Sequence, residues 1–291
     1  MFGQIPLHNE LKARERVIQL VNKTKQDAGI SGGAYYRGPG DLVARCLNIT
    51  VIESQLNADE GLYLNSDPPT ILLDTHGFDR DRVNFTFFHE ITHHLIKQDD
   101  DLIAFVHEFA FEDSEKLVEA LCNIGAAEFL VPSREIRSAI DSEGFRIELL
   151  INFDKIYPAS KPAIAIQLAQ CAPHQCIVVV CEFGQLPGHR QTQSLPMWAG
   201  DEKQPEQLFT QLASSSPSVR YAPGRFVKIR SDHLLWQVFQ EKKAMSGTAQ
   251  IPFHSGKKWE TRCDAIYYLG KVYAAFHIDT PPSPLQQNFG F

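Results

Sequence analysis

VNFTFFHEITHHLIKQ, at residues 83–98, is the stretch from which the fold can be argued. It contains neither proline nor glycine, and its apolar residues recur at the spacing of a helix that is buried on most of its surface. Short runs rich in β-forming residues come before it, separated by polar or Asp-Pro-Pro turns: NITVIE (48–53), GLYLN (61–65) and TILLDT (70–75). The sequence therefore predicts a small sheet that is followed by a buried helix.

This helix carries the motif HEITH, which begins at His89 and ends at His93. Residues four apart share a helix face, so both imidazoles can point at one metal ion while Glu90 lies beside it. Two neutral imidazoles and a carboxylate leave the fourth position of a tetrahedral Zn²⁺ ion open for water, whose pKa falls to about 7. Glu90 can then take a proton from this water and pass it to the leaving amine. The motif predicts a metal-dependent peptidase, and the alternative is a helix with two incidental histidines.

A third ligand has to come from elsewhere in the chain, because Ile96 and Asp99 stand where the extended zincin motif has glycine and histidine. The next predicted helix, DSEKLVEALCNIGAAEFL (113–130), begins with acidic residues and ends before Pro132. The carboxylates in it and just before it are Glu112, Asp113, Glu115, Glu119 and Glu128.

Among these carboxylates, Glu119 is the predicted ligand. Apolar residues lie at helical offsets from it, so its side chain is expected to face inward, where a metal ion would compensate for its burial. Asn123, one turn later, is expected to hold a ligating carboxylate in place. The remaining candidates are interpreted as solvated or supporting residues and not as ligands: Glu112, Glu115, His94 and His107.

Composition excludes several classes of protein. The 291 residues carry a formal charge of −7 and are 43% hydrophobic, which argues against a disordered chain and against tight, sequence-independent binding to nucleic acid. No stretch approaches the roughly 20 apolar residues that cross a bilayer, and the first residues lack the apolar run of a secretory signal. Six widely spaced cysteines suit neither a disulfide framework nor a zinc ribbon, and Cys171, Cys176 and Cys181 are predicted to pack in a core. We therefore expect a soluble, cytoplasmic protein of two or three domains that contacts no membrane.

The rest of the chain predicts a helical segment and then a region of mixed structure. Three helices are predicted after Pro132: SREIRSAIDSEG (133–144), RIELLINFDKI (146–156) and KPAIAIQLAQ (161–170). The short turn between the last two is compatible with a helix-turn-helix. Residues 184–224 are rich in Gly, Pro, Gln and Ser and are predicted to be mostly linker or loop. Beyond them, the helix DHLLWQVFQEKKA (232–244) and two aromatic-rich strands around Gly270 predict an α+β module.

Two of these segments, RVNFTFFHEITHHL (82–95) and EALCNIGAAEFLVP (119–132), resemble the ImmA/IrrE family of metallopeptidases. The matching features are Arg82, Phe85, Thr86, the HExxH motif, and a glutamate thirteen residues before the proline that closes the second helix. Two positions depart from the pattern, because Thr92 stands where glycine is frequent and Cys122 stands where alanine is frequent. The resemblance implies that the metal is bound by His89, His93 and Glu119 and that Glu90 is catalytic.

The order of a peptidase-like region, a helical segment and an α+β C-terminal part is similar to that of longer, radiation-response members of the family. The resemblance then implies an α+β protein with a zincin-like metallopeptidase domain at residues 1–132, a helix-turn-helix-like helical domain at 133–174 and a GAF-like sensor domain at 175–291. It implies a gluzincin-like zinc metalloendopeptidase that cleaves a helix-turn-helix transcriptional repressor and thereby induces the response to radiation and DNA damage.

The competing hypothesis is a DNA-binding or sensor-type transcriptional regulator with a structural metal. KPAIAIQLAQ has one lysine, no arginine and two glutamines, which suits phosphate and base contacts poorly, so contact with protein is favoured while direct DNA binding is left open. A structural zinc site is closed by four protein ligands and needs no glutamate beside the first histidine, so Glu90 favours catalysis.

The remaining expectations concern the metal and the substrate. Zn²⁺ is chosen from the motif, although two histidines and a carboxylate also accommodate manganese or iron. An extended protein substrate is expected to add to an exposed sheet edge, formed by GLYLN or TILLDT. The oxyanion could be stabilised by Tyr35, Tyr36 or a histidine, and the sequence does not choose among them.

Overall fold

The computed structural model describes residues 7–57, 59–109, 114–186, 205–219 and 221–278. The chain divides into two compact units: the first contains Met1–Ser138 and Phe153–Gln167, and the second contains Ala139–Asn152 and Leu168–Phe291. Each unit combines helices with a sheet, as predicted for an α+β chain, whereas the division at residues 132 and 174 stays a prediction. None of the described helices is long and apolar enough to cross a membrane.

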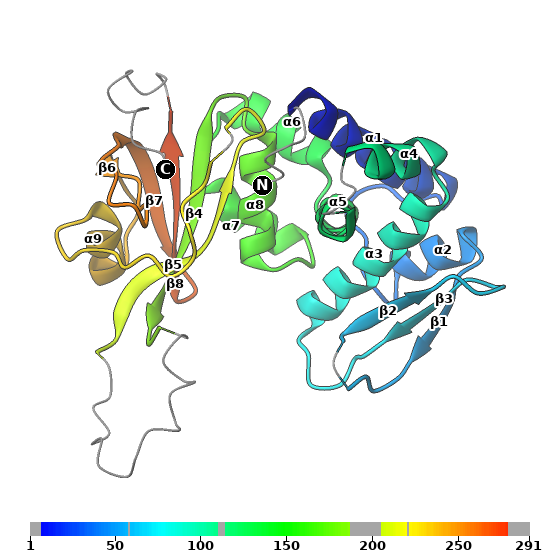
Figure 1. Ribbon diagram of the computed structural model, residues 1–291. Helices are drawn as coiled ribbons and strands as arrows, with labels where there is room; N and C mark the ends of the chain where they lie inside the picture. Colours follow the sequence, from blue (N-terminus) through cyan, green and yellow to red (C-terminus); the bar gives the residue numbers. More distant parts are fainter. Residues whose placement is uncertain (1–6, 58, 110–113, 187–204, 220, 279–291) are drawn as a thin grey trace, which may run out of the picture. The chain divides into compact units, whose positions relative to one another are not determined.

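The first unit is a three-stranded sheet with helices around it (Figure 1). Its elements are α1 (Leu7–Asp27), α2 (Pro39–Cys46), β1 (Thr50–Glu53), β2 (Gly61–Leu64), β3 (Thr70–Leu73), α3 (Arg80–Lys97), α4 (Asp100–Phe109) and α5 (Ser114–Leu130). Three further helices are each divided between the two units: α6 (Ser133–Glu143), α7 (Leu149–Ile156) and α8 (Lys161–Cys171). The helices predicted at residues 83–98 and 113–130 correspond to α3 and α5, the three predicted strands to β1, β2 and β3, and α4 was not expected.

The sheet of the first unit has the strand order β1-β3-β2. The central strand β3 pairs in parallel with β1 and antiparallel with β2, and its residues Ile71 and Leu73 are fully buried. Because β3 has a partner on both sides, the prediction that TILLDT forms an exposed edge for a substrate is wrong. Among the described residues, β2 pairs only with β3, so its other edge can accept a further strand.

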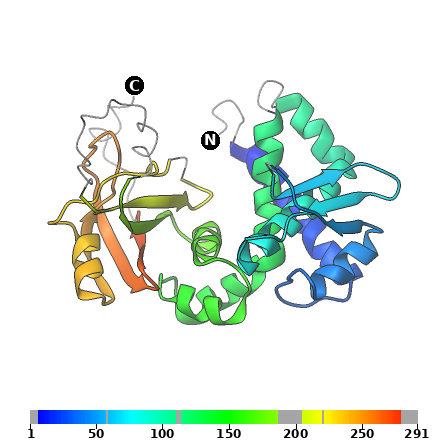
Figure 2. The ribbon, with the colours of Figure 1, turned by 90° about the horizontal axis from the view of Figure 1, so that it is seen from below.

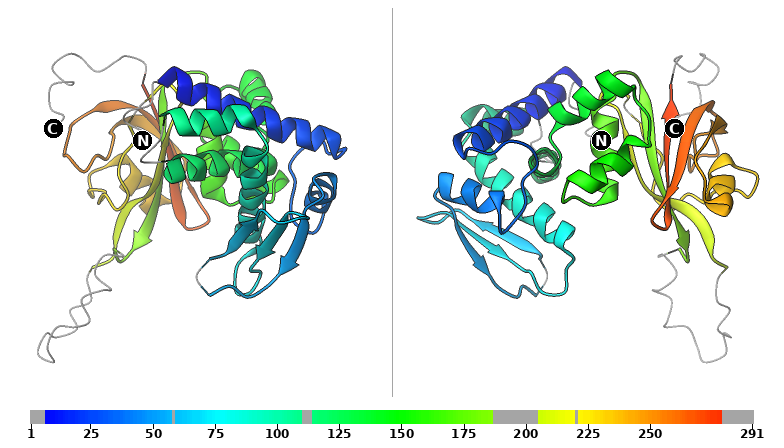
Figure 3. Two further views of the ribbon diagram at one scale, coloured as in Figure 1. Left: turned by 45° about the vertical axis from the view of Figure 1, so that its right-hand side comes forward. Right: turned by 180° about the vertical axis from the view of Figure 1, so that it is seen from behind.

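The long helix α3 begins at a side-chain cap and continues as a buried core helix. Asp79 precedes it, and its carboxylate accepts a hydrogen bond from the backbone N–H of Arg82 at 2.8 Å, which satisfies one of the free amides at the helix start. Two turns on, Phe88 is fully buried and stacks on Phe129 of α5 with ring centroids 4.7 Å apart. The burial expected from the sequence therefore arises from packing of α3 against the sheet and α5 (Figures 1 and 3).

The close approach of α3 and α5 depends on Gly125. A β-carbon at this position would lie 2.4 Å from both the hydroxyl oxygen and the methyl carbon of Thr92, which is fully buried. Thr92 is β-branched and its hydroxyl donates to the carbonyl of Phe88 at 2.8 Å, so it has little freedom to move away. Glycine at residue 125 therefore sets the distance between the two helices.

Replacing Gly125 with alanine is expected to destabilise the first unit. Alanine favours a helix over glycine by about 1 kcal/mol, but overpacking a close interface costs about 1–3 kcal/mol, and the contact with Thr92 makes the second effect the larger. Urea unfolding followed by circular dichroism would show a lower midpoint. The control is Gly184→Ala at the end of β4, where no atom lies within 4 Å of the added β-carbon. A Gly125→Ala protein as stable as the unchanged one would contradict this role.

The second unit is built on a five-stranded antiparallel sheet of order β5-β4-β8-β7-β6 (Figure 2). Its elements are β4 (Cys176–Gly184), β5 (Gln207–Ser215), α9 (Leu234–Glu241), β6 (Met245–Gln250), β7 (Glu260–Tyr268) and β8 (Lys271–His277). Leu235 and Val238 of α9 pack with inward residues of β4, β7 and β8 in one core. Cys171, Cys176 and Cys181 are buried, as predicted.

The prediction that residues 184–224 are mostly linker or loop is wrong in part. Residues 207–215 form β5, which pairs with β4, whereas residues 187–204 lie outside the described part of the chain. The strand was missed because it lies at the edge of the sheet, where six of its nine residues are only partly buried and polar side chains are accepted. β6, at the opposite edge, was likewise not predicted.

The helix α9 begins at a histidine cap that should make the second unit sensitive to acid. Nδ1 of His233 accepts from the backbone N–H of Leu235 at 3.1 Å, and Nε2–H donates to the carbonyl of Gln250 at 2.7 Å, so the folded state uses the neutral imidazole. Burial lowers the pKa of His233 below its ordinary value of 6.5. The unfolded chain therefore takes up a proton first, and this contribution to stability is present above pH 6.5 and is lost as the pH falls toward the lowered pKa.

Thermal unfolding at pH 8 and pH 5 tests this cap. We expect His233→Asn to keep an acceptor for the backbone N–H of Leu235 but to remove the titrating group, so the fall in melting temperature between the two pH values becomes smaller. An equal fall in both proteins would show that other groups cause the acid sensitivity.

Candidate active site

Both histidines of the HEITH motif lie on the face of α3 that meets α5. The rings of His89 and His93 are one turn apart, with centroids separated by 4.9 Å, and their side chains are 14% and 17% exposed. Burial is the largest cause that lowers the pKa of His93, which favours the neutral form that binds metals. The helix thus presents two imidazoles to one point, as its i, i+4 spacing predicted.

Glu119 brings a carboxylate to both imidazoles. Its Oε2 lies 3.1 Å from Nε2 of His89, and its Oε1 lies 3.2 Å from Nε2 of His93. The structure therefore places the three predicted ligands together. The side chain of Glu119 was expected to be buried, but it is 49% exposed. The N-terminal part of α5 lies at the surface, and the carboxylate reaches the histidines from the solvent side.

Asn123 fixes which nitrogen of His89 is available. Its amide oxygen lies 3.1 Å from Nδ1 of His89, and because an amide oxygen only accepts, Nδ1–H is the donor, so in the neutral imidazole the lone pair is on Nε2. Asn123 was expected to hold the ligating carboxylate, and the structure corrects this: it holds the imidazole. Helical spacing placed Asn123 on the right face, but the partner depends on how α5 packs on α3.

The three side chains fit a metal ion. When His89 is neutral, its Nε2 lone pair and Glu119 Oε2 are two acceptors 3.1 Å apart, and a cation between them would stabilise this arrangement. In a tetrahedral zinc site, bonds of about 2.0–2.2 Å separate the ligand atoms by roughly 3.3 Å. The observed separations of 3.1 and 3.2 Å are close to that value.

Glu90 is buried beside the two histidines, with 7% of its surface exposed. Burial raises the pKa of Glu90 to about 7, while a hydrogen bond from the backbone N–H of Tyr63 in β2 acts in the opposite direction. Gly61 of the same strand makes room for it, since a β-carbon there would lie 3.0 Å from Cγ of Glu90 and 2.6 Å from the methyl group of Thr86. The carboxylate therefore lies between the face of α3 that carries the two histidines and the outer edge of β2.

The other candidates from the sequence do not join the cluster. His94 is buried, and its Nδ1 lies 3.0 Å from the hydroxyl of Tyr63. His107 and Glu115 are exposed. Glu128 is fully buried and accepts from the backbone N–H of Ser133 and the amide of Gln167, so it is a structural carboxylate. Glu112 and Asp113 lie outside the described residues.

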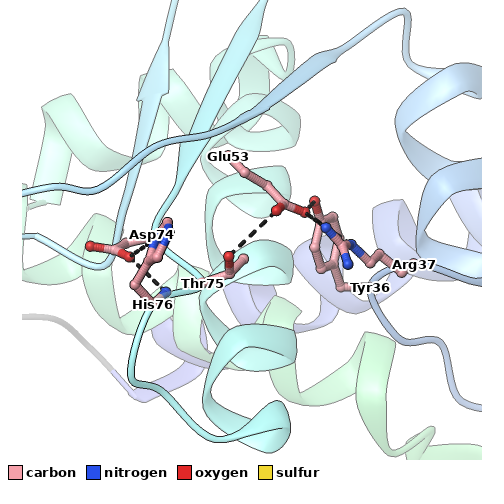
Figure 4. Close-up of polar contacts among 6 residues, drawn as sticks. All are labelled: Tyr36, Arg37, Glu53, Asp74, Thr75 and His76. Carbon is pink, nitrogen blue, oxygen red and sulfur yellow. Dashed lines mark hydrogen bonds and ion pairs between the residues drawn. The ribbon is translucent and has the colours of Figure 1, made fainter.

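The two tyrosines proposed for the oxyanion are engaged elsewhere. The hydroxyl of Tyr36 donates to Oε1 of Glu53 at 2.7 Å, and the Nε–H of Arg37 donates to the same oxygen at 2.9 Å (Figure 4). The ring of Tyr35 lies under the guanidinium of Arg80, 5.1 Å from its centroid. Tyr36 and Arg80 instead line a pocket of about 350 Å³, together with Arg37, Thr75, Val83 and Asn84. The structure thus leaves both tyrosines without a contact to the histidine cluster.

One neighbour of the histidines was not identified from the sequence. The sulfur of Cys122 and one nitrogen each of His89 and His93 lie within 4.8 Å of one another. Burial raises the pKa of the Cys122 thiol. Its position three residues after Glu119 on the same helix is the signal that could have found it.

Comparison with known proteins agrees with this geometry. Residues 44–168 match the model of the M78 peptidase family, described as an IrrE N-terminal-like domain. The chain is 27% identical over 200 residues to the radiation response metalloprotease IrrE of Deinococcus radiodurans, covering 68% of this chain and 60% of that protein. It is 25% identical over 218 residues to the radiation response metalloprotease IrrE of Deinococcus deserti, covering 72% of this chain and 74% of that protein.

A solved structure extends the likeness of the fold. The chain resembles a Mycobacterium tuberculosis transcriptional regulator with a TM-score of 0.54 and 14% identity, over 91% of this chain and 80% of that one, which shows a shared fold alone. The resemblance predicted from residues 82–95 and 119–132 is confirmed by the family model and by the two relatives. This chain is therefore similar to the ImmA/IrrE metallopeptidases, with an IrrE N-terminal-like domain at residues 44–168.

Proposed function

We propose that the first unit is a zinc-dependent metalloendopeptidase of the zincin type, in which His89, His93 and Glu119 bind the metal and Glu90 is the general base. The observation that carries this proposal is the approach of both imidazole Nε2 atoms to one carboxylate, at 3.1 and 3.2 Å. Zinc is favoured over manganese because imidazole nitrogens make up two of the three ligands and the separations suit a tetrahedral ion.

The chain's own residues then divide the work of hydrolysis. A zinc ion held by His89, His93 and Glu119 would lower the pKa of a water molecule and polarise the scissile carbonyl. Glu90 would act as the base that accepts a proton from the attacking water and donates it to the leaving amine, a role that suits a carboxylate whose pKa is raised to about 7. Asn123 holds the ring of His89 so that Nε2 faces the metal.

The substrate is proposed to be an extended segment of another protein. The free edge of β2 runs next to Glu90, since Tyr63 in that strand donates its backbone N–H to the Glu90 carboxylate. A peptide added along this edge would be held by main-chain hydrogen bonds, with its backbone beside the general base. Of the two edges predicted from the sequence, β2 therefore remains.

We further propose that this substrate is a helix-turn-helix transcriptional repressor, whose cleavage induces the response to radiation and DNA damage. The support is the resemblance to two radiation response metalloproteases. The 60% coverage of the first relative leaves part of that protein without a counterpart in the alignment. We also propose that residues 133–174 form a helix-turn-helix-like domain and residues 175–291 a GAF-like sensor domain. The six cysteines of the whole chain form no disulfide, which supports a cytoplasmic protein.

The alternative of a DNA-binding regulator gains no support from α8, the candidate recognition helix. Its side chains are buried or half-buried, and its polar groups are used within the protein. Gln167 donates to Glu128 and to the carbonyl of Val131, and Gln170 donates to the carbonyl of Ser215. Direct reading of bases would require these amides to be free.

Cleavage of candidate repressors tests the proposal. The purified protein would be freed of metal with a chelator, reloaded with Zn²⁺ and incubated with helix-turn-helix repressors encoded in the same genome. We expect defined fragments from one repressor with Zn²⁺ and none with the chelator. If the reloaded protein cuts none of them and instead retains operator DNA on a gel, the regulator hypothesis replaces this one.

A further inference from the structure

Cys122 differs from the other cysteines in what surrounds it. It lies on α5, three residues after Glu119, and is fully buried. Its sulfur, one nitrogen of His89 and one of His93 lie within 4.8 Å of one another. Its surroundings therefore include two groups that bind metals.

Among the described residues, none of the other cysteines belongs to a group of three potential metal ligands of this kind. Cys46 is exposed on α2, and the other four lie in the second unit, where they are buried: Cys171, Cys176, Cys181 and Cys263. A buried free cysteine usually behaves as a small hydrophobic residue, and packing accounts for these four.

We propose that Cys122 is an additional ligand of the metal site, so that the resting centre is held by two imidazoles, one carboxylate and one thiolate. This inference rests on the proposed function, since it concerns the same metal. Nitrogen and sulfur ligands of a tetrahedral zinc ion are roughly 3.5 Å apart, so the sulfur, which lies within 4.8 Å of both nitrogens, would have to move inward by at most about 1.3 Å. Metal binding releases the thiol proton to solvent, because a coordinating thiol is deprotonated.

Two consequences follow for the peptidase. A thiolate is a soft ligand, so the site would select Zn²⁺, Co²⁺ or Cd²⁺ over Mn²⁺. Four protein ligands also fill a tetrahedral ion, so the resting site offers no open position. Substrate turnover would then require either a fifth ligand position or departure of the thiolate, and Cys122 would restrain the enzyme.

Cobalt spectroscopy of the full chain tests this ligand directly. The protein would be stripped of metal and titrated with Co²⁺, with cobalt content measured by elemental analysis. We expect an intense thiolate-to-cobalt charge-transfer band in the near ultraviolet that reaches its maximum at one ion per chain. The band should disappear in Cys122→Ala, which places the residue frequent in the family, and persist in the control Cys46→Ala. We also expect Cys122→Ala to lower the affinity for Cd²⁺ by roughly ten-fold or more while leaving that for Mn²⁺ unchanged.

The outcomes separate this inference from the proposed function. Cobalt bound by the unchanged protein without the charge-transfer band would overturn the role of Cys122 and leave the three-ligand site intact. A band that persists in Cys122→Ala would also overturn it, because the thiolate would come from another residue. Failure of the unchanged, folded protein to bind cobalt or zinc would overturn both the ligand and the metallopeptidase.

Discussion

Replacing Glu90 with glutamine is expected to lower peptide hydrolysis by about 10²–10⁴-fold while zinc remains bound. The amide keeps the shape of the side chain but cannot take a proton, so only steps that need a base are affected. Glu90 is buried between α3 and β2 and makes no contact with Glu119, His89 or His93 through a hydrogen bond in the described structure. The two measurements are the rate of repressor cleavage and the zinc content of the purified protein.

The control for Glu90→Gln is Glu108→Gln. Glu108 is exposed on α4 and lies outside the histidine cluster, so the same chemical change should leave both cleavage and zinc content as they are. If Glu90→Gln cleaves the repressor at the rate of the unchanged protein, Glu90 is not the general base. Loss of zinc together with loss of cleavage would instead show that the substitution disturbs the metal site.

The histidine pair could be predicted because it depends on local geometry alone. One helix without proline or glycine fixes the direction of His89 and His93, and no distant part of the chain is needed. The third proposed ligand was harder to predict. Glu119 could be selected on its helix by spacing, but its exposure could not, because that depends on where the end of α5 meets solvent. Glu128, on the same helix, is the carboxylate that is buried.

The features that could not be predicted from the sequence depend on contacts between helices and strands. The partner of Asn123 and the approach of Cys122 to the imidazoles depend on the register of α5 against α3, which Gly125 and Thr92 set through their contact. Helical periodicity gives the face of a helix but not its translation along a neighbour. The edge strand β5 was missed for a related reason, since pairing with β4 decides its conformation more than its own composition does.

Replacing Glu119 with alanine is expected to weaken zinc binding by at least 10–100-fold. Loss of a group that only supports a ligand costs about that much, so loss of the ligand itself should cost no less. The side chain is 49% exposed, so its removal leaves no buried cavity and should not unfold the first unit. Competition with a chromophoric chelator gives the affinity, and the gain in melting temperature on adding zinc should shrink accordingly.

The matched control is Glu115→Ala, which removes the same side chain one turn earlier on α5. Glu115 is exposed and forms no described contact with the histidines, so zinc affinity should stay that of the unchanged protein. If both variants bind zinc equally well, the carboxylate of Glu119 is not a ligand. Binding retained in Glu119→Ala but lost when Cys122→Ala is added would show that the sulfur can replace the carboxylate. The metal would then be held from the buried side of α5, and the exposed carboxylate would act on the substrate and not on the ion.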